Sequence, residues 1–471
     1  MVLASFIQDR DFIDACYLVA SVLFILGIRG LSHPRTARRG NVLASVGMLI
    51  AVVATLLDPE IENFGLIILG IAVGTAVGVV SARAVKMTAM PQMVALFNGV
   101  GGGAVAAVAL SEYHELIPEA GEIPLETLLP TLLACVIGAV SFAGSMIAFA
   151  KLQELMTGRP IVFPGNQFVN AGLVLGILAI VVYLATGEES EGLFVAMLAG
   201  ALVFGVMLII PIGGADMPVV ISMLNAFTGL SAAGAGFVLD NTALIIAGSL
   251  VGSSGTLLTI LMGRAMNRSL ANVLFGAFGA APSGPSGAAG DGAGGTVREA
   301  TANDVAAMLA YADRVVVVPG YGLAVAQAQH TVRELADELE KRGVEVSYAI
   351  HPVAGRMPGH MNVLLAEADV PYEALKEMDE VNPDFPTTDV ALVIGANDVT
   401  NPAARHDKSS PIYGMPILDV DKSHQVVVLK RSMNPGFAGI ENELYYQEQT
   451  AMLFGDAKDS VSKLVAEVKN A

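Results

Sequence analysis

The sequence predicts a multi-pass α-helical membrane domain followed by an α/β domain with a doubly wound parallel sheet. Three observations lead to this fold class. The first part of the chain contains apolar runs long enough to cross a bilayer, a stretch of small residues follows, and the rest alternates strand-like and helix-like segments. We expect the membrane domain over residues 1–265, a linker over 266–300 and the α/β domain over 301–471.

Composition agrees with this division. Hydrophobic residues make up 54% of the chain and charged residues only 15%, which is too apolar for an ordinary soluble protein. The net charge of −18 argues against nucleic acid as a partner, because its phosphates require a basic surface. Cys16 and Cys135 lie in separate apolar runs, so we expect neither a disulfide framework nor a metal site.

Nine apolar runs are predicted to cross the lipid bilayer, since each holds close to the 20 or so apolar residues that a spanning helix needs. Basic residues follow the first, third, fifth and ninth runs, whereas the alternate loops are acidic. Because lysine and arginine concentrate on the cytoplasmic side, we expect the N-terminus outside and the α/β domain in the cytoplasm. The runs lie near 12–28, 41–57, 64–82, 92–111, 127–150, 167–186, 192–210, 218–239 and 242–262.

Polar side chains inside the runs are candidates for a proton path, because such groups are costly in a membrane. Asn98, Asn225, Ser253 and Ser254 lie within predicted spans, and Asp216 lies at the cytoplasmic mouth of the eighth. For Asn98 or Asn225 alone, the simpler interpretation is a hydrogen bond between helices, and the whole set could serve only to pack the helices. No histidine lies in a predicted span, so the runs lack the side chain that most readily titrates near neutral pH.

The second half of the chain is predicted to form strands separated by helices. Residues 276–296 are almost all Gly, Ala, Ser and Pro, a composition typical of a flexible tether. We expect strands over 314–319, 344–350, 390–394, 416–420 and 426–429. A helix over 323–342, ending at Gly343, and a final helix over 460–468 complete the prediction.

A glycine motif in this half predicts a Rossmann-like nucleotide site. Gly320-x-Gly322-x-x-Val325 follows a strand and opens a helix, the context in which glycines let a pyrophosphate approach the backbone. The alternative is a plain turn between strand and helix. No acid follows the second strand, where Arg356 stands instead, and this favours a 2′-phosphate and hence NADP(H). Loops after the third and fifth strands, 395–398 and 430–436, add candidate phosphate ligands.

Taken together, these segments resemble the beta subunit of proton-translocating NAD(P) transhydrogenase over nearly the whole chain. The matching stretches in the α/β half include Pro-Gly-Tyr-Gly-Leu-Ala-Val from Pro319, His-Pro-Val-Ala-Gly-Arg-Met-Pro-Gly-His from His351, Gly-Ala-Asn-Asp from Gly395 and Lys-Arg-Ser-Met-Asn-Pro-Gly-Phe from Lys430. Gly-Ala-Asp-Met-Pro from Gly214 matches in the membrane half.

The resemblance implies that this chain binds NADP(H), while a partner alpha subunit binds NAD(H) and carries further spans. It implies hydride transfer from NADH to NADP⁺, driven by protons moving inward across a bacterial cytoplasmic (inner) membrane, in a homodimer of the alpha–beta unit. The implied cofactor-binding residues are Gly320, Tyr321, Gly322, Val325, Val353, Ala354, Gly355, Arg356, Met357, Pro358, Gly395, Ala396, Asn397, Asp398, Lys430, Arg431, Ser432, Gly436, Phe437, Asp456 and Ala457.

The resemblance also assigns particular roles. Lys430, Arg431 and Ser432 would bind the 2′-phosphate, which moves Arg356 to the phosphate or ribose region of the cofactor. Asp398 would lie near the nicotinamide and couple protonation to redox state. Some relatives carry histidine where this chain has Asn98, so we expect the titrating group of the proton path on the partner's spans.

A second function remains open at this point. The alternative to the transhydrogenase function is a nucleotide-gated transporter or channel, in which the α/β domain only senses a nucleotide. Turnover separates the two, because a sensor binds the cofactor but transfers no hydride.

Overall fold

The structure is a computed structural model that describes residues 9–59, 61–119, 123–157, 160–187, 190–267, 296–357, 359–408, 410, 412–436 and 438–470. It forms two compact units, Met1–Ile212 with Val220–Thr259, and Gly213–Val219 with Ile260–Ala471. Most of the predicted linker lies outside the described residues, as do Pro358 and Phe437 of the predicted cofactor site.

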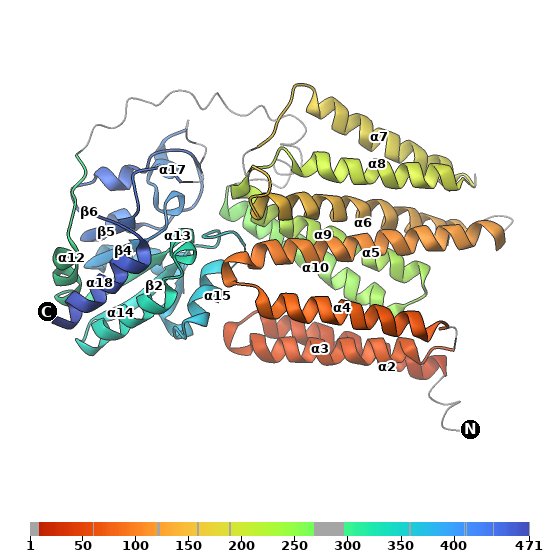
Figure 1. The fold of residues 1–471 in the computed structure, drawn as a ribbon, viewed down its shortest axis with the longest axis horizontal. Helices are drawn as coiled ribbons and strands as arrows, with labels where there is room; N and C mark the ends of the chain where they lie inside the picture. Colours follow the sequence, from red (N-terminus) through yellow and green to blue (C-terminus); the bar gives the residue numbers. More distant parts are fainter. Residues whose placement is uncertain are drawn as a thin grey trace. The chain divides into compact units, whose positions relative to one another are not determined.

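The helical unit confirms the predicted membrane domain. Within the described residues, nine helices are long and apolar enough to cross a membrane (Figure 1). The chain is therefore a multi-pass membrane protein. The helices are α2 (Arg10–Leu31), α3 (Pro34–Leu56), α4 (Phe64–Ala84), α5 (Met90–Glu119), α6 (Leu125–Leu152), α7 (Asn166–Ala185), α8 (Glu191–Ile209), α9 (Met217–Val238) and α10 (Thr242–Ala265).

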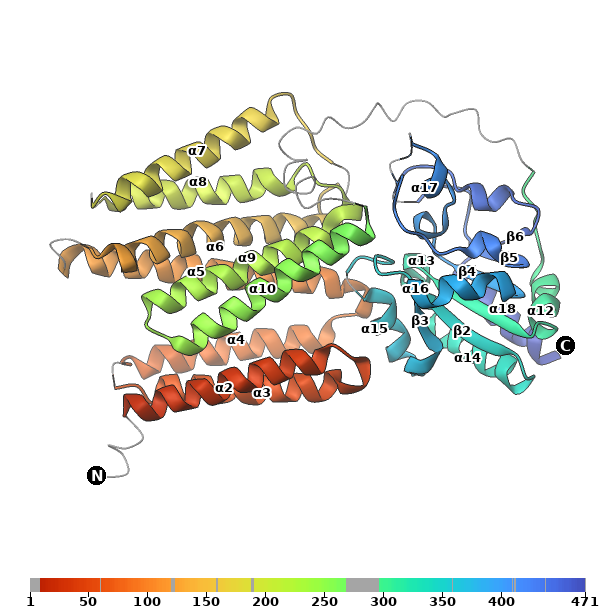
Figure 2. The ribbon, with the colours of Figure 1, turned by 180° about the vertical axis from the view of Figure 1, so that it is seen from behind.

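Helices α6 and α9 form the interior of this unit. In their most apolar windows, 61% of α6 and 67% of α9 is buried, whereas the other spans are buried by a third or less. Helix α5 packs along α6, and α8 packs against α6 as well (Figure 2). Polar side chains on α6 and α9 therefore lie away from lipid and need partners inside the unit.

The α/β unit confirms the predicted doubly wound parallel sheet. Six strands pair in the order β3-β2-β1-β4-β5-β6, and every pair is parallel. The order reverses between β1 and β4, which is where open α/β sheets bind their ligands. The strands are β1 (Arg314–Pro319), β2 (Glu345–Ile350), β3 (Leu375–Glu377), β4 (Val390–Ile394), β5 (Gln425–Lys430) and β6 (Thr450–Phe454).

Helices cover both faces of the sheet, so the central strands are buried on both sides and consist almost wholly of branched apolar residues. On one face, α14 and α18 lie side by side (Figure 1). On the other, Val381 and Phe385 belong to the hydrophobic core formed with β1, β4 and β5. The helices are α12 (Ala302–Ala310), α13 (Tyr321–Val325), α14 (Gln329–Lys341), α15 (His360–Glu367), α16 (Met378–Val381), α17 (Ala403–His406) and α18 (Ala457–Asn470).

The predicted strand over 416–420 is wrong. In the structure this segment lies outside the sheet, and its last residue begins a short 3-10 helix, Val420–Lys422. The Asn382 side chain makes two hydrogen bonds to the backbone of this segment. Its Nδ2 donates to the Ile417 carbonyl, and its Oδ1 accepts from the Asp419 amide. These side-chain contacts replace a strand ladder. The sequence also missed β3, which has only three residues, and β6.

The single helix predicted over 323–342 is two helices. Helix α13 ends at Val325 and α14 begins at Gln329, with Gln327 between them at φ +50°. The short α13 completes the glycine turn, and the separate, amphipathic α14 then packs against β2 of the sheet. The final helix begins at Ala457, three residues before its predicted start at 460.

Three glycines bring the ends of β1 and β4 together. A Cβ on Gly320 would lie 2.4 Å from Ala396 Cα, and a Cβ on Gly322 would lie 2.7 Å from Gly395 Cα. The Gly322 amide donates to the Gly395 carbonyl at 3.0 Å. Gly395 itself has φ +69°, a conformation that side chains rarely adopt. The two turns therefore meet through their backbones.

We predict that Gly395→Ala destabilises the α/β unit more than Gly343→Ala. Both glycines have positive φ, but only a Cβ at Gly395 meets another backbone, that of Gly322 at 2.4 Å. Gly343→Ala should lower the free energy of unfolding by about 1–3 kcal/mol from backbone strain. Gly395→Ala should add about 1–3 kcal/mol more from the forced contact. Calorimetry of the detergent-solubilised chain measures both, and equal losses would contradict the backbone contact.

Candidate functional site

The predicted cofactor residues that the structure describes all follow the carboxyl ends of strands. Because the strands are parallel, these loops share one edge of the sheet. The loops are Gly320–Val325 after β1, Val353–Met357 after β2, Gly395–Asp398 after β4, Lys430–Ser432 with Gly436 from the last residue of β5 onward, and Asp456–Ala457 after β6.

On the β1–β2 side, an arginine lies over an aromatic ring. The Arg356 guanidinium is 4.4 Å from the centre of the Tyr321 ring. The backbone amide of Arg356 donates to His360 Nδ1 at 3.0 Å, and burial together with the Arg356 charge lowers the pKa of His360. A side chain on Gly355 would collide with His360. The β2 loop is thus fixed at its backbone, with a half-buried cation beside the glycine turn.

His351, which directly follows β2, is a neutral anchor for this loop. It is 2% exposed, and its Nε2 lies 2.8 Å from the Pro416 carbonyl. Its Nδ1 accepts the Val353 amide at 3.3 Å. Both contacts suit one tautomer, with the proton on Nε2. Burial lowers the pKa of His351 to about 4, against a weaker opposing effect of the Pro416 carbonyl.

On the β4–β5 side, partly buried hydrogen bonds hold Asn397 and Asp398. Asn397 Oδ1 accepts from the Tyr445 hydroxyl at 2.7 Å and from Asn442 Nδ2 at 3.2 Å. Asn442 Nδ2 also donates to the Asn397 carbonyl at 3.0 Å. The Asp398 carboxylate accepts the Ala438 amide at 3.0 Å. The loop after β4 is therefore bonded to the segment between β5 and β6.

Cations cluster after β5. Lys430 Nζ lies 4.8 Å from the centre of the Tyr445 ring and donates to the Asn434 carbonyl. Burial lowers the pKa of Lys430, and the Asp398 carboxylate opposes this shift, which sets the two charges within electrostatic reach. Arg431 and Ser432 are exposed. This end of the site presents positive charge and hydroxyl to the surface.

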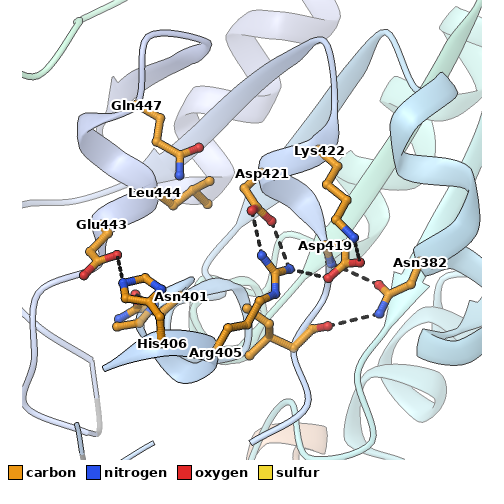
Figure 3. A network of polar contacts seen from close by, with 12 residues as sticks. Asn382, Asn401, Arg405, His406, Asp419, Asp421, Lys422, Glu443, Leu444 and Gln447 are labelled. Atoms are coloured by element: carbon orange, nitrogen blue, oxygen red, sulfur yellow. Dashed lines mark hydrogen bonds and ion pairs between the residues drawn. The ribbon is translucent and has the colours of Figure 1, made fainter. Parts of the chain in front are cut away.

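An ion network that the sequence analysis missed holds the chain just after Asp398. Arg405 of α17 pairs with Asp421, with an Nη1–Oδ2 distance of 2.7 Å, and also with Asp419 (Figure 3). Lys422 Nζ lies 2.6 Å from Asp419 Oδ2. The partners are 14 and 16 residues apart from Arg405, and no local pattern marks them.

Two predicted residues have plainer roles in the structure. Asp456 Oδ1 accepts the Lys458 amide at 2.9 Å and the Asp459 amide at 3.4 Å, so it caps α18. Val325 is 46% exposed on α13 and does not take the packing role of a third glycine. Val353 packs partly against the core, and Ala354 is buried. Their contact with a cofactor stays a prediction.

The arrangement fits a phosphorylated dinucleotide. The glycines of β1 and β4 leave no room for side chains at the point where the strand order reverses, so a ligand there meets backbone. Arg356 stands on one side of this point, and Lys430 with Arg431 on the other. Cations on both sides match a ligand with phosphates at separate positions.

In the helical unit, Asn98 joins a network that spans three helices. Its Nδ2 donates to Ser145 Oγ at 2.9 Å and to Ser141 Oγ at 3.3 Å, both on α6. The Ser141 and Thr228 hydroxyls lie 2.6 Å apart, which extends the network to α9. Ser141 and Ser145 are fully buried. No sequence pattern singled out the two serines or Thr228, because hydroxyl side chains are common in spans.

The other predicted path residues do not join this network through the described hydrogen bonds. Ser253 and Ser254 are exposed on α10, and the Ser254 hydroxyl donates to the Val251 carbonyl of its own helix. Asn225 is half-buried on α9. Asp216 ends the 3-10 helix Gly214–Asp216, just before α9 begins. Their part in a path stays a prediction that needs another chain to cover α10.

Comparison with known proteins agrees with the resemblance drawn from the motifs. A family model described as NAD(P) transhydrogenase beta subunit matches residues 13–467. The chain is 54% identical over 459 residues to NAD(P) transhydrogenase subunit beta of Rhodospirillum rubrum, covering 96% of this chain and 98% of that protein. A second sequence of the same name, from a specified strain of Rhodospirillum rubrum, matches with the same identity and coverage.

We predict that His351 makes the α/β unit less stable at acid pH. Its pKa in the fold, about 4, lies below its ordinary value of 6.5. The stability is therefore complete above pH 6.5 and falls by about 3 kcal/mol as pH approaches 4. His351→Gln should flatten this slope, whereas the exposed His330→Gln should not. Hydrogen exchange of the β2 and β4 amides measures the stability at each pH. The same dependence on pH in the native chain and both variants would refute the role of His351.

Proposed function

Because this chain belongs to the NAD(P) transhydrogenase beta subunit family, we propose that it binds NADP(H) and exchanges hydride with NAD(H) held by an alpha subunit. One observation carries the proposal. Glycine backbones form the floor of the site where the strand order reverses, and cations stand on both sides of that floor. The chain has one such sheet among its described residues, so the second nucleotide belongs on a partner.

In this proposal, the cations divide the cofactor between them. Lys430, Arg431 and Ser432 bind the 2′-phosphate, and Arg356 binds the phosphate or ribose region. The exposure of Arg431 and Ser432 supports this, since a free phosphate ligand needs reachable donors. The pyrophosphate lies along the turn of Gly320 and Gly322, whose small size allows backbone contact.

Asp398 and Asn397 act at the nicotinamide end. NADP(H) supplies the hydride acceptor or donor, so the protein needs to orient the ring and exclude water. The bonds from Tyr445 and Asn442 to Asn397 support a rigid loop there. The carboxylate of Asp398, within reach of the Lys430 charge, makes the site sensitive to the charge on the nicotinamide, which differs between NADP⁺ and NADPH.

Hydride transfer from NADH to NADP⁺ is coupled in this proposal to protons moving inward across the bacterial cytoplasmic membrane. The nine spans and the buried network of Asn98, Ser141 and Thr228 support a path through the helical unit. Asp216 directly precedes the start of α9 and serves as the gate. Asn225, Ser253 and Ser254 line the path where the alpha subunit's spans cover α10.

The proposal includes the assembly and its orientation. The N-terminus is outside and the α/β unit in the cytoplasm, as the alternating basic and acidic loops indicate. Two alpha–beta units form a homodimer. The competing function, nucleotide sensing that gates a transporter, differs in one measurable respect, because it requires binding without hydride transfer.

We predict that Lys430→Ala weakens the binding of NADP(H) but not that of NAD(H). A charged hydrogen bond contributes about 1.5–3 kcal/mol, so the affinity should fall roughly 10- to 100-fold. NAD(H), which lacks the 2′-phosphate, should bind the variant as it binds the native chain. Isothermal titration with each cofactor measures the effect. Lys463→Ala, an exposed lysine of α18, is the control. An equal loss of affinity for NADP(H) and NAD(H) would show that Lys430 does not bind the 2′-phosphate.

We predict that the purified chain transfers no hydride between NADH and NADP⁺ until an alpha subunit is added. The physical reason is positional, since direct transfer requires the two nicotinamides to be held together. Absorbance of an NADP⁺ analogue with a shifted spectrum follows the reaction. Transfer by the chain alone would contradict the two-subunit arrangement. Tight NADP(H) binding with no transfer, even with the partner, would favour the sensing function.

A further inference from the structure

One buried charge has no part in the function proposed above. Lys151 lies in the last turn of α6 and is 3% exposed. Among the residues that the structure describes, it is the only Lys, Arg, Asp or Glu that is buried. Its sequence position matches a basic residue that only marks the cytoplasmic side. Such a lysine extends its ammonium toward water, but that of Lys151 does not reach it.

Three backbone carbonyls surround the ammonium instead. Nζ donates to the Ile210 carbonyl at 2.5 Å, to the Ile212 carbonyl at 2.7 Å and to the Ile209 carbonyl at 3.3 Å. An ammonium has three donors and no acceptor, so these contacts use all of them. The lysine on α6 thereby holds the end of α8 and the turn that follows it.

The charge is balanced by a helix end. Helix α8 ends at Ile209, and the last carbonyls of a helix carry a partial negative charge with no partners in the helix itself. Among the described residues, the hydrogen bonds of the Lys151 ammonium all go to backbone carbonyls, and no carboxylate forms an ion pair with it. The Ile161 amide also donates to the Ile210 carbonyl, at 3.2 Å. The helix end is thus held from two sides.

The turn that Lys151 holds leads directly to the proposed gate. Gly213 follows Ile212, the 3-10 helix Gly214–Asp216 comes next, and α9 begins at Met217. We propose that Lys151 is a positioning residue that clamps the connection between α8 and α9 and so fixes Asp216 for coupled proton movement. This inference rests on the proposed function, because it gives that function a fixed mechanical element.

The test compares Lys151→Met with Lys86→Met in membrane vesicles that contain the alpha subunit. Methionine keeps the length of lysine and removes its charge and donors. Lys86 is exposed and lies in another loop of the predicted cytoplasmic side, so it controls for loss of positive charge. Two quantities are measured, hydrogen exchange of peptides covering 206–216 and protons moved per hydride transferred.

In Lys151→Met, the Ile210 and Ile212 amides should exchange roughly tenfold faster, because the end of α8 and its turn lose the three hydrogen bonds that their carbonyls accept from the ammonium. Protons moved per hydride should fall at least twofold, while NADP(H) affinity stays within twofold of native. Lys86→Met should match the native protein in all three. Unchanged exchange and an unchanged proton ratio in Lys151→Met would overturn the proposal.

A measurement on the native chain covers the case in which the variant does not fold. Reductive methylation of vesicles should modify Lys86 and leave Lys151 unmodified until the chain is denatured. Equal rates for the two lysines would overturn the clamp. If the native protein moves no protons while Lys151 stays protected, the proposed coupling fails and the clamp remains as a structural contact only.

Discussion

The backbone contact between the β1 and β4 turns is the constraint on which the α/β unit depends. Gly320, Gly322 and Gly395 approach so closely that no Cβ fits between them. Because all strands are parallel, this contact sits at the edge where every strand ends, and at the point where their order reverses. The loops of β2 and β5 then flank a floor made of backbone. Their cations, Arg356 and Lys430, thus lie on opposite sides of this floor.

A second constraint acts in both units, since a polar group removed from water needs a partner. In the α/β unit, His351 meets it with a carbonyl and an amide, and Asn397 with a buried hydroxyl and an amide. In the helical unit, Asn98 meets it with two serines, and Lys151 with a helix end. The same requirement thus fixes the loops after β2 and β4 in one unit, and it joins neighbouring helices and one helix end in the other.

Local patterns predicted the parts whose physics is local. Apolar runs of spanning length identified the nine spans found among the described residues, and short apolar segments identified β1, β2, β4 and β5. The same reasoning failed for 416–420, where side chains from Asn382 replace a strand ladder. It also failed for the helix after the glycine turn, which is interrupted between α13 and α14 by Gln327 at φ +50°. Short β3 gave too little pattern to detect.

By itself, the sequence determined the two units, the parallel sheet and the loops that hold the candidate site, because these follow from hydropathy, spacing and residue type. Only the tertiary structure decided which side chains meet. Tyr445 reaches Asn397 across 48 residues, and Lys151 reaches the end of α8 across 58 or more. Such contacts arise when distant segments pack together, and the energy that selects them is absent from any local stretch of chain.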